Sequence, residues 1–259
     1  MSNNLQPRST DDAAAQPLYT PIKRRSFFMY AGATAGATAL VLAGCSDDTD
    51  TPTNNNLVNV GSGDVGVLNY AYALEQLEAA FYTQLRTGTY YTGLAATSAE
   101  KQILDDLYYH EVIHREFFKA AITAAAPTQI IKGLTPNFSA IDFNSRTSVL
   151  GTAKAFEDLG VAAYNGAGQY ITSPLYLTIA GKIVSVEARH AAIIRDLVQE
   201  GSFIDNSVVT LTSANMSASA GGAGTSGSSV ERSMTPGEVT TAANNFLADG
   251  SKLDASGLR

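Results

Sequence analysis

Four stretches of this 259-residue chain have the periodicity of long amphipathic helices, and each carries a glutamate in the middle of its apolar stripe. A buried carboxylate is unfavourable unless it is paired with a cation or bound to a metal. Four carboxylates in one core would repel one another, and a pair of divalent metal ions is the simplest compensation. The stretches are residues 64–86, 97–125, 145–170 and 174–201, and their glutamates are Glu75, Glu111, Glu157 and Glu187.

The ends of these stretches carry helix-boundary signals. Thr97 followed by Glu100 has the spacing of a capping box, Pro127 closes the second stretch, and Pro174 opens the fourth. Only the link over residues 126–144, between the second and third helices, is long. The sequence therefore predicts an all-α four-helix bundle over residues 64–201 with one long crossover.

Two of the three histidines in the chain follow a glutamate by three residues. These motifs are Glu111-x-x-His114 and Glu187-x-x-His190. Residues three apart on a helix share a face, so both side chains of a motif can reach one ion. The remaining helices also match each other, because Tyr82 and Tyr164 lie seven residues after their respective glutamates. The pattern indicates two quasi-equivalent halves, each supplying half of a site.

The only cysteine, Cys45, excludes a disulfide framework and a multi-thiolate metal site within the chain. Any metal must then take oxygen and nitrogen ligands. Such a set suits iron or manganese better than copper(I), and zinc remains open if only one ion binds.

The segments Leu74–Tyr82 (LEQLEAAFY) and Val186–His190 (VEARH) resemble the ferritin-like domain family, which includes desiccation-related proteins. The resemblance covers roughly residues 64–201. It implies a dinuclear iron or manganese centre in which Glu111 and Glu187 bridge the ions. The implied terminal ligands are Glu75, Glu157, His114 and His190.

Further residues lie near this expected site. Tyr82 and Tyr164 are expected to be core residues that hydrogen-bond a ligand, with redox participation as the minor alternative. Glu78, one turn after Glu75, is either a neighbour of the site or a partly exposed surface acid. His110 is expected to be a surface or capping histidine in preference to a further metal ligand.

The N-terminal segment, residues 1–44, contains two export signatures. The pair Arg24-Arg25 followed by Ser-Phe-Phe resembles a twin-arginine signal, and Leu-Ala-Gly-Cys45 resembles a bacterial lipobox. Together they imply passage through the twin-arginine machinery, cleavage before Cys45 and a lipid anchor on its thiol. The expected product is a membrane-anchored lipoprotein facing the periplasm or cell exterior. The alternative is an ordinary secretory signal with a chance cysteine.

The segments flanking the bundle are polar. Residues 45–63 are expected to form a flexible tether, and residues 202–259 an extension with a Gly/Ser-rich stretch over 213–229 and a short helix from Thr235 to about Asp249. Residues 1–44 hold four of the 17 basic and two of the 24 acidic residues, so the remainder has a formal charge of −9. This charge disfavours nucleic acid as a partner.

The leading functional hypothesis is an envelope redox or peroxide-detoxifying metalloprotein of the catalase or peroxidase type. The alternative is a stress-related structural or metal-binding protein with little turnover. Ferroxidase or iron storage ranks last, because a lipid-anchored chain with long flexible tails is poorly suited to assemble into the closed hollow shell that storage needs. A rubrerythrin-type peroxidase is also disfavoured, because the chain has no pair of cysteines for an attached rubredoxin centre. Assembly into a homo-oligomer is compatible with all of these.

Overall fold

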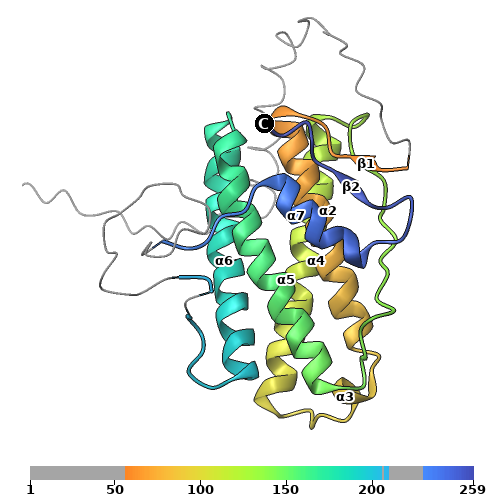
Figure 1. The fold of residues 1–259 in the computed structure, drawn as a ribbon, viewed down its shortest axis with the longest axis vertical. Coiled ribbons are helices and arrows are strands. Elements are labelled where there is room, and N and C mark those ends of the chain that lie inside the picture. The colour runs from red at the N-terminus through yellow and green to blue at the C-terminus, as the bar shows by residue number, and fades with distance from the viewer. Residues whose placement is uncertain (1–55, 206, 210–229) are drawn as a thin grey trace, which may run out of the picture. The chain divides into compact units, whose positions relative to one another are not determined.

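The computed structural model describes residues 56–205, 207–209 and 230–259, all within the second of two units, residues 47–259. Four long helices run beside one another (Figure 1). They confirm the predicted all-α four-helix bundle, and each predicted helix is present within a few residues of its expected ends. The helices are α2 (Gly63–Leu85), α4 (Ala99–Ala125), α5 (Arg146–Ala167) and α6 (Pro174–Val198).

Helix α2 is the most deeply buried of the four. It packs on α4 and α5, and the side chains of Phe81, Tyr82 and Leu85 near its end are fully covered. The ring of Phe81 makes edge-on contacts with Phe138 and Phe156, which come from the crossover link and from α5. This aromatic cluster lies beside one of the stripe glutamates, since Phe156 directly precedes Glu157 in α5.

The start of α4 differs from the sequence prediction. Ser98 is the N-cap, and its hydroxyl accepts a hydrogen bond from the backbone N–H of Lys101. The predicted capping box of Thr97 and Glu100 does not form, because the Glu100 carboxylate accepts from the hydroxyl of Tyr90 instead. Tyr90 belongs to α3 (Thr89–Thr92), a single turn that the sequence analysis did not predict.

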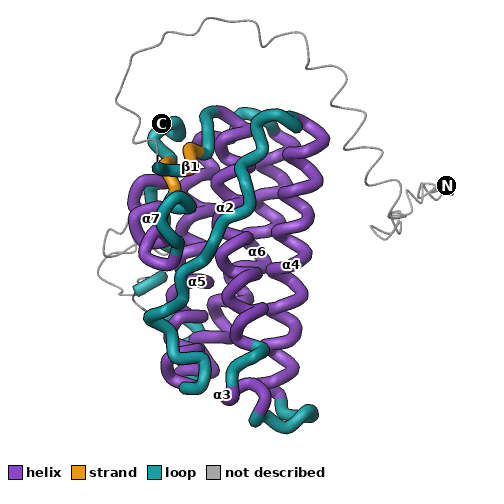
Figure 2. Tube along the Cα trace, turned by 90° about the vertical axis from the view of Figure 1, so that its right-hand side faces the viewer, coloured by secondary structure: helices purple, strands orange, loops and turns teal. Residues whose placement is uncertain are grey.

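The long crossover between α4 and α5 follows the outside of α2 as an irregular strap (Figure 2). Two polar side chains of α2 hold it there. The amide of Asn69 donates to the carbonyl of Gln129 and accepts from the N–H of Ile131, while Gln76 accepts from the N–H of Leu134. Farther along, the link pairs with the C-terminal segment through an isolated antiparallel bridge between Pro136 and Leu247. Side chains of α2 thus satisfy backbone groups in the part of the link before this bridge.

The C-terminal segment packs onto the bundle. It contains α7 (Pro236–Ala243), which is followed by the 3₁₀ turn η3 (Asn244–Phe246). Another 3₁₀ turn, η1 (Gly168–Tyr170), follows α5. The N–H of Met234 donates to the carbonyl of Ala162 on α5, and a β-carbon at Gly166 would lie 1.8 Å from the Met234 oxygen. Only glycine at position 166 allows this approach.

The predicted flexible tether over residues 45–63 needs correction in its described part. Val58–Asn59 forms strand β1, which pairs in parallel with β2 (Leu253–Asp254) near the end of the chain. The side chains of Val58 and Val60 are buried, so this short alternating segment has a packed face that its polar neighbours concealed. The folded domain therefore starts before the residue that the sequence analysis assigned.

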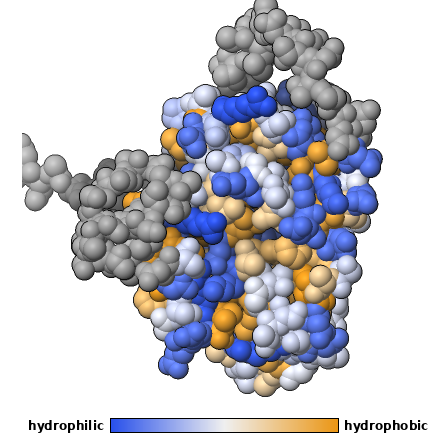
Figure 3. Space-filling model, viewed as in Figure 1, coloured by the Kyte–Doolittle hydropathy of each residue, from blue (hydrophilic) through white to orange (hydrophobic). Residues whose placement is uncertain are grey.

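Within the described ranges, no helix combines the length and apolarity needed to cross a bilayer. The face drawn in Figure 3 mixes hydrophilic and hydrophobic residues. The residues of the predicted export and lipid signals, Arg24, Arg25 and Cys45, lie outside the described part of the chain, as does the Gly/Ser-rich stretch 213–229.

Candidate metal centre

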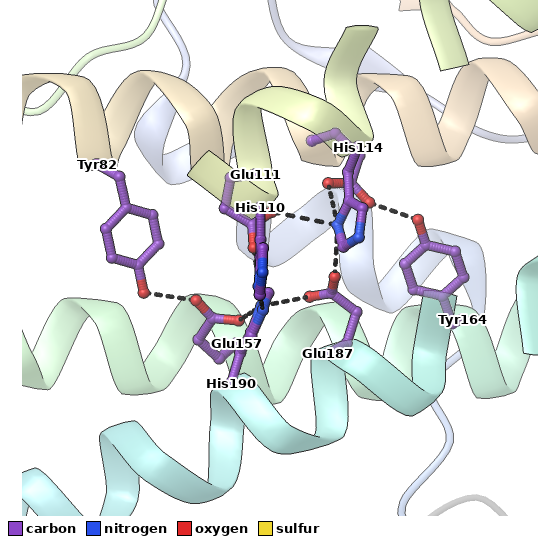
Figure 4. Close-up of polar contacts among 9 residues, drawn as sticks. Tyr82, His110, Glu111, His114, Glu157, Tyr164, Glu187 and His190 are labelled. Atoms are coloured by element: carbon purple, nitrogen blue, oxygen red, sulfur yellow. Dashed lines mark hydrogen bonds and ion pairs between the residues drawn. The ribbon is translucent and has the colours of Figure 1, made fainter. Parts of the chain in front are cut away.

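The four stripe glutamates meet in the core of the bundle. Each comes from a different long helix, and each has an exposed fraction of 0%. The two motif histidines reach the same level from α4 and α6 (Figure 4). The structure thus brings all six predicted ligand residues together: Glu75, Glu111, His114, Glu157, Glu187 and His190.

These side chains form two overlapping groups whose nitrogen and oxygen donor atoms lie within 4.8 Å of one another. Glu111 and Glu187 belong to both groups. The first group is completed by Glu75 and His114, and the second by Glu157 and His190. A shared pair of carboxylates between two sets of donors is the arrangement in which two ions could be bridged.

The first group is centred on His114. Its Nδ1 atom lies 2.8 Å from Glu187 Oε1, 3.4 Å from Glu75 Oε2 and 3.8 Å from Glu111 Oε2. The closest carboxylate is therefore the one on the facing helix α6, and the one in its own motif is farthest away.

The second group repeats this geometry around His190. Its Nδ1 atom lies 2.9 Å from Glu111 Oε1, 3.4 Å from Glu157 Oε2 and 3.8 Å from Glu187 Oε2. Glu111 and Glu187 each direct one oxygen to each histidine. The internal symmetry of the sequence is thus a spatial symmetry of the site.

The two tyrosines connect the halves. The Tyr82 hydroxyl donates to Glu157 Oε1 at 2.5 Å, and the Tyr164 hydroxyl donates to Glu75 Oε1 at 2.5 Å. Each tyrosine therefore contacts the glutamate of the opposite half (Figure 4). In each of these glutamates one oxygen is held by a tyrosine and the other faces a histidine.

The site's electrostatics are those of a crowded acid cluster with two cations. Burial alone would lower the pKa of His190, but the neighbouring carboxylates of Glu111 and Glu157 raise it to about 11. For His114 the carboxylates likewise outweigh burial and raise the pKa. Burial would raise the pKa of Glu111, but the two histidines hold it at about 2.

In the other three glutamates, burial outweighs the effect of the histidines, so the pKa is raised. Burial raises the pKa of Glu75 to about 7, and it also raises the pKa of Glu157. The pKa of Glu187 is raised well above its usual value by burial and then by the charge of Glu111. At neutral pH, protons on the histidines and on some of these acids keep the repulsion low.

The donor atoms fit a metal ion because they are buried and have no hydrogen-bond partner within the described residues. Although the histidines approach carboxylates closely, neither Nδ1 atom forms a hydrogen bond of normal geometry within the described residues. Buried polar atoms in proteins are nearly always hydrogen-bonded or coordinated. Oxygen and imidazole donors in this number could hold iron, manganese or zinc. The unpartnered atoms are Glu75 Oε2, both oxygens of Glu111 and Glu187, Glu157 Oε2, and Nδ1 of His114 and His190.

Two further residues are placed differently from what the sequence alone indicated. Glu78 has an exposed fraction of 5%, so it is a buried acid and the surface alternative is wrong. His110 has an exposed side chain, but its Nδ1 lies 2.8 Å from Nε2 of His190. The four-residue spacing of His110 and His114, which puts both on one side of α4, was the available signal for this contact.

Comparison with known proteins places the bundle in a family. Residues 63–200, more than half of the chain, match the ferritin-like domain. No curated protein matched the chain. The matched residues include all four helices that supply the acid and histidine cluster.

Proposed function

The chain belongs to the ferritin-like domain family, and on that basis we propose that its bundle core binds two metal ions, one in each half of the site. The observation that carries this proposal is the pair of overlapping donor groups with buried, unpartnered atoms. Glu111 and Glu187 would bridge the ions, since each has one oxygen toward each histidine. The terminal ligands would be Glu75 and His114 on one side, and Glu157 and His190 on the other.

The tyrosine hydroxyls and the burial of the glutamates determine how the ligand oxygens would face the ions. The hydroxyls of Tyr82 and Tyr164 orient the two terminal glutamates, so that the free oxygen of each points inward. Burial of all four glutamates excludes bulk water and strengthens their interaction with a cation. Iron or manganese bound by such a set supplies redox chemistry toward dioxygen or hydrogen peroxide.

The function we propose is that of a redox metalloprotein that removes peroxide or oxygen species. A non-enzymatic role in stress, as a structural or metal-binding protein, is the alternative, and ferroxidase or storage activity ranks below both. Tyr82 is buried and Tyr164 is half-buried, both are hydrogen-bonded to proposed ligand residues, and burial of the hydroxyls raises the pKa of both groups. Both therefore remain protonated donors at neutral pH.

This proposal is tested by metal analysis and a peroxide assay on the purified full chain. After anaerobic loading with Mn(II) or Fe(II), we expect two bound ions per chain by mass spectrometry and oxygen release from hydrogen peroxide. A Glu75→Gln/Glu157→Gln variant should lose both, whereas Glu116→Gln removes an exposed acid from α4 and should change neither. Two ions without peroxide or oxygen chemistry would favour the structural alternative, and no bound ion would refute the metal proposal.

We further propose that the chain is exported by the twin-arginine route and anchored to a membrane by lipid on Cys45, facing the periplasm or cell exterior. Export after folding would let the ions be acquired in the cytoplasm, away from more tightly binding copper and zinc. In a bacterial host, Cys45→Ser should move the protein from the membrane to the soluble fraction. Arg24→Lys/Arg25→Lys should retain the precursor in the cytoplasm. Unchanged fractionation of both variants would contradict the proposal.

A further inference from the structure

One end of the bundle gathers the start of α2, the end of α4, the start of α6 and strand β1 (Figure 1). Asp64 in the first turn of α2 accepts a hydrogen bond from the N–H of Ser173, the N-cap of α6. Asn69, also in α2, donates to the carbonyls of Val60 and Gln129, which follow β1 and α4. We call this part of the molecule the β1 end, and it comprises residues 56–66, 117–132 and 165–182.

Charged residues are unevenly distributed between this end and the opposite one. The β1 end holds three lysines, all exposed, and a single acid, Asp64, which is hydrogen-bonded to the start of α6. Residues 253–259 lie beside it through the pairing of β2 with β1, and they add one acidic and one basic side chain. The other halves of α4 and α6 carry acids that are exposed or half-buried, so the β1 end is the basic end of an acidic domain. The lysines are Lys119, Lys132 and Lys182, and the acids of the opposite end are Glu100, Asp105, Asp106, Asp196 and Glu200.

The β1 end also exposes large apolar side chains. Leu175 and Leu177 at the start of α6 have exposed fractions of 44% and 48%, and Leu57, just before β1, has 37%. Leucines beside lysines form the kind of surface that binds anionic bilayers, because the apolar groups enter the headgroup region while the cations attract the lipid phosphates.

Exposed apolar residues at the opposite end have different neighbours. Phe203 and Ile204, which follow α6, have exposed fractions of 55% and 42%. They lie between Glu200 and Asp205 in the chain, and these acids would be repelled by anionic lipid. Apolar exposure is therefore similar at the two ends, and the charge distinguishes them.

The proposed lipid anchor joins the folded domain at the β1 end. Only residues 46–56 separate Cys45 from Leu57. Even a fully extended segment of this length spans no more than about 40 Å. Helix α4, with its 27 residues, is itself about 40 Å long. Lipid on Cys45 would therefore keep the β1 end near the bilayer.

We propose that the β1 end is a second membrane contact, in which Leu57, Leu175 and Leu177 enter the headgroup region of an anionic bilayer and the lysines bind lipid phosphates. The inference rests on the proposed anchor at Cys45, and it adds the face of the bundle that meets the lipid. Because the anchor raises the effective concentration of bilayer at this end, a few contacts suffice to dock it. The docked bundle holds α3 away from the membrane.

The test determines which end of the lipidated protein touches lipid. Mature protein from a bacterial host is reconstituted into phosphatidylcholine vesicles with or without phosphatidylglycerol, and part of the lipid carries a nitroxide quencher. A thiol-reactive fluorophore is attached to Leu177→Cys or to the matched control Phe203→Cys, since acylation of Cys45 leaves no other thiol in the mature chain. With phosphatidylglycerol present, we expect quenching at position 177 and none at position 203.

The lysines are tested in the protein labelled at position 177. Lys132→Gln and Lys182→Gln should each shift the equilibrium between docked and undocked protein about fivefold toward the undocked form, because each removes one cation near an anionic surface. Added salt should have the same effect. Lys154→Gln, in the first half of α5, is the matched control and should leave the quenching unchanged.

The outcomes separate this inference from the anchor on which it rests. Mature protein that leaves the vesicles, or that takes up the fluorophore at Cys45, would refute the anchor. Vesicle-bound protein with no quenching at position 177, or with equal quenching at position 203, would overturn only the docking surface. Energy transfer between labels at position 177 of neighbouring chains, without quenching by lipid, would assign the surface to a second copy of the chain and would likewise overturn it.

Discussion

Glu111→Gln and Glu187→Gln should each abolish the binding of two ions, but only Glu111→Gln should strongly destabilise the metal-free protein. Both variants remove a carboxylate shared by the two donor groups, so neither ion keeps a full ligand set. We expect no more than one weakly bound ion per chain in either variant. Mass spectrometry of the loaded and desalted proteins measures this.

The difference in stability follows from the protonation of the two carboxyl groups. In the metal-free protein Glu111 is the anion that balances two buried imidazolium groups, which is why its pKa is lowered to about 2. Its removal leaves the buried His190 cation without its nearest carboxylate, which lies 2.9 Å from Nδ1, and breaking such a buried pair costs about 3 to 5 kcal/mol. The pKa of Glu187 is raised by burial, so its neutral form already resembles glutamine. Glu187→Gln should change the free energy of unfolding by less than about 1 kcal/mol.

Urea unfolding of the chelator-treated proteins, followed by circular dichroism at pH 7, gives these free energies. Glu116→Gln makes the same charge change on the exposed side of α4 and serves as the control. A metal-free Glu111→Gln protein as stable as the wild type would contradict the charge balance that we assign. Retention of both ions in either variant would contradict the shared-carboxylate arrangement.

Lowering the pH should weaken the overall binding of the ion pair by about 100-fold per pH unit near neutrality, because at least two protons must leave the site when both ions bind. The pKa of His190 is raised to about 11 and that of His114 is also raised, so both rings are protonated at pH 7 in the metal-free protein. Each ring must lose its Nδ1 proton before it can bind an ion. Protons held by Glu75, whose pKa is about 7, add to the effect below neutrality.

Calorimetric titration with Mn(II) in two buffers of different ionisation heat measures the number of protons released. We expect two or more per pair of ions, together with an affinity that rises between pH 6 and pH 8. An affinity independent of pH in this window would show that the histidines are already neutral, which would refute the assigned protonation.

The stability of the metal-free protein should fall as the pH rises, whereas its affinity for metal ions should increase. A histidine whose pKa is raised by folding stabilises the fold at low pH, and that contribution is lost as the pH rises from 6.5 toward the folded value of about 11 for His190. Buried carboxyl groups with raised pKa act in the same direction, since they must ionise inside the core. Thermal unfolding of chelator-treated protein should therefore occur at lower temperature at pH 9 than at pH 7.

Much of the candidate site could be predicted because its information is local. The helical period shows which residues share a face, so each Glu-x-x-His motif can be identified without knowing its neighbours. A glutamate in an apolar stripe marks its own helix as facing a charged core. The four helices, the long crossover and the six converging side chains followed from such patterns.

The C-terminal contacts could not be predicted from local patterns. Asn59 pairs with Asp254, 195 residues away, and only the folded chain brings Met234 onto Ala162. Residues 58–60 are too short a segment for their alternation to stand out. These contacts exist because buried apolar residues at both ends of the described domain, such as Val58, Val60 and Leu253, belong to one hydrophobic core.

The sequence by itself determined the fold class and the six side chains that converge in the core, because both depend on the spacing of residues along single helices. Only the tertiary structure decided how the halves are connected: each tyrosine bonds the opposite glutamate, His110 stacks on His190, and Glu78 uses the space left by Gly160. The physical reason is that these contacts depend on the rotation and height of one helix against another. No spacing within a single helix carries that information.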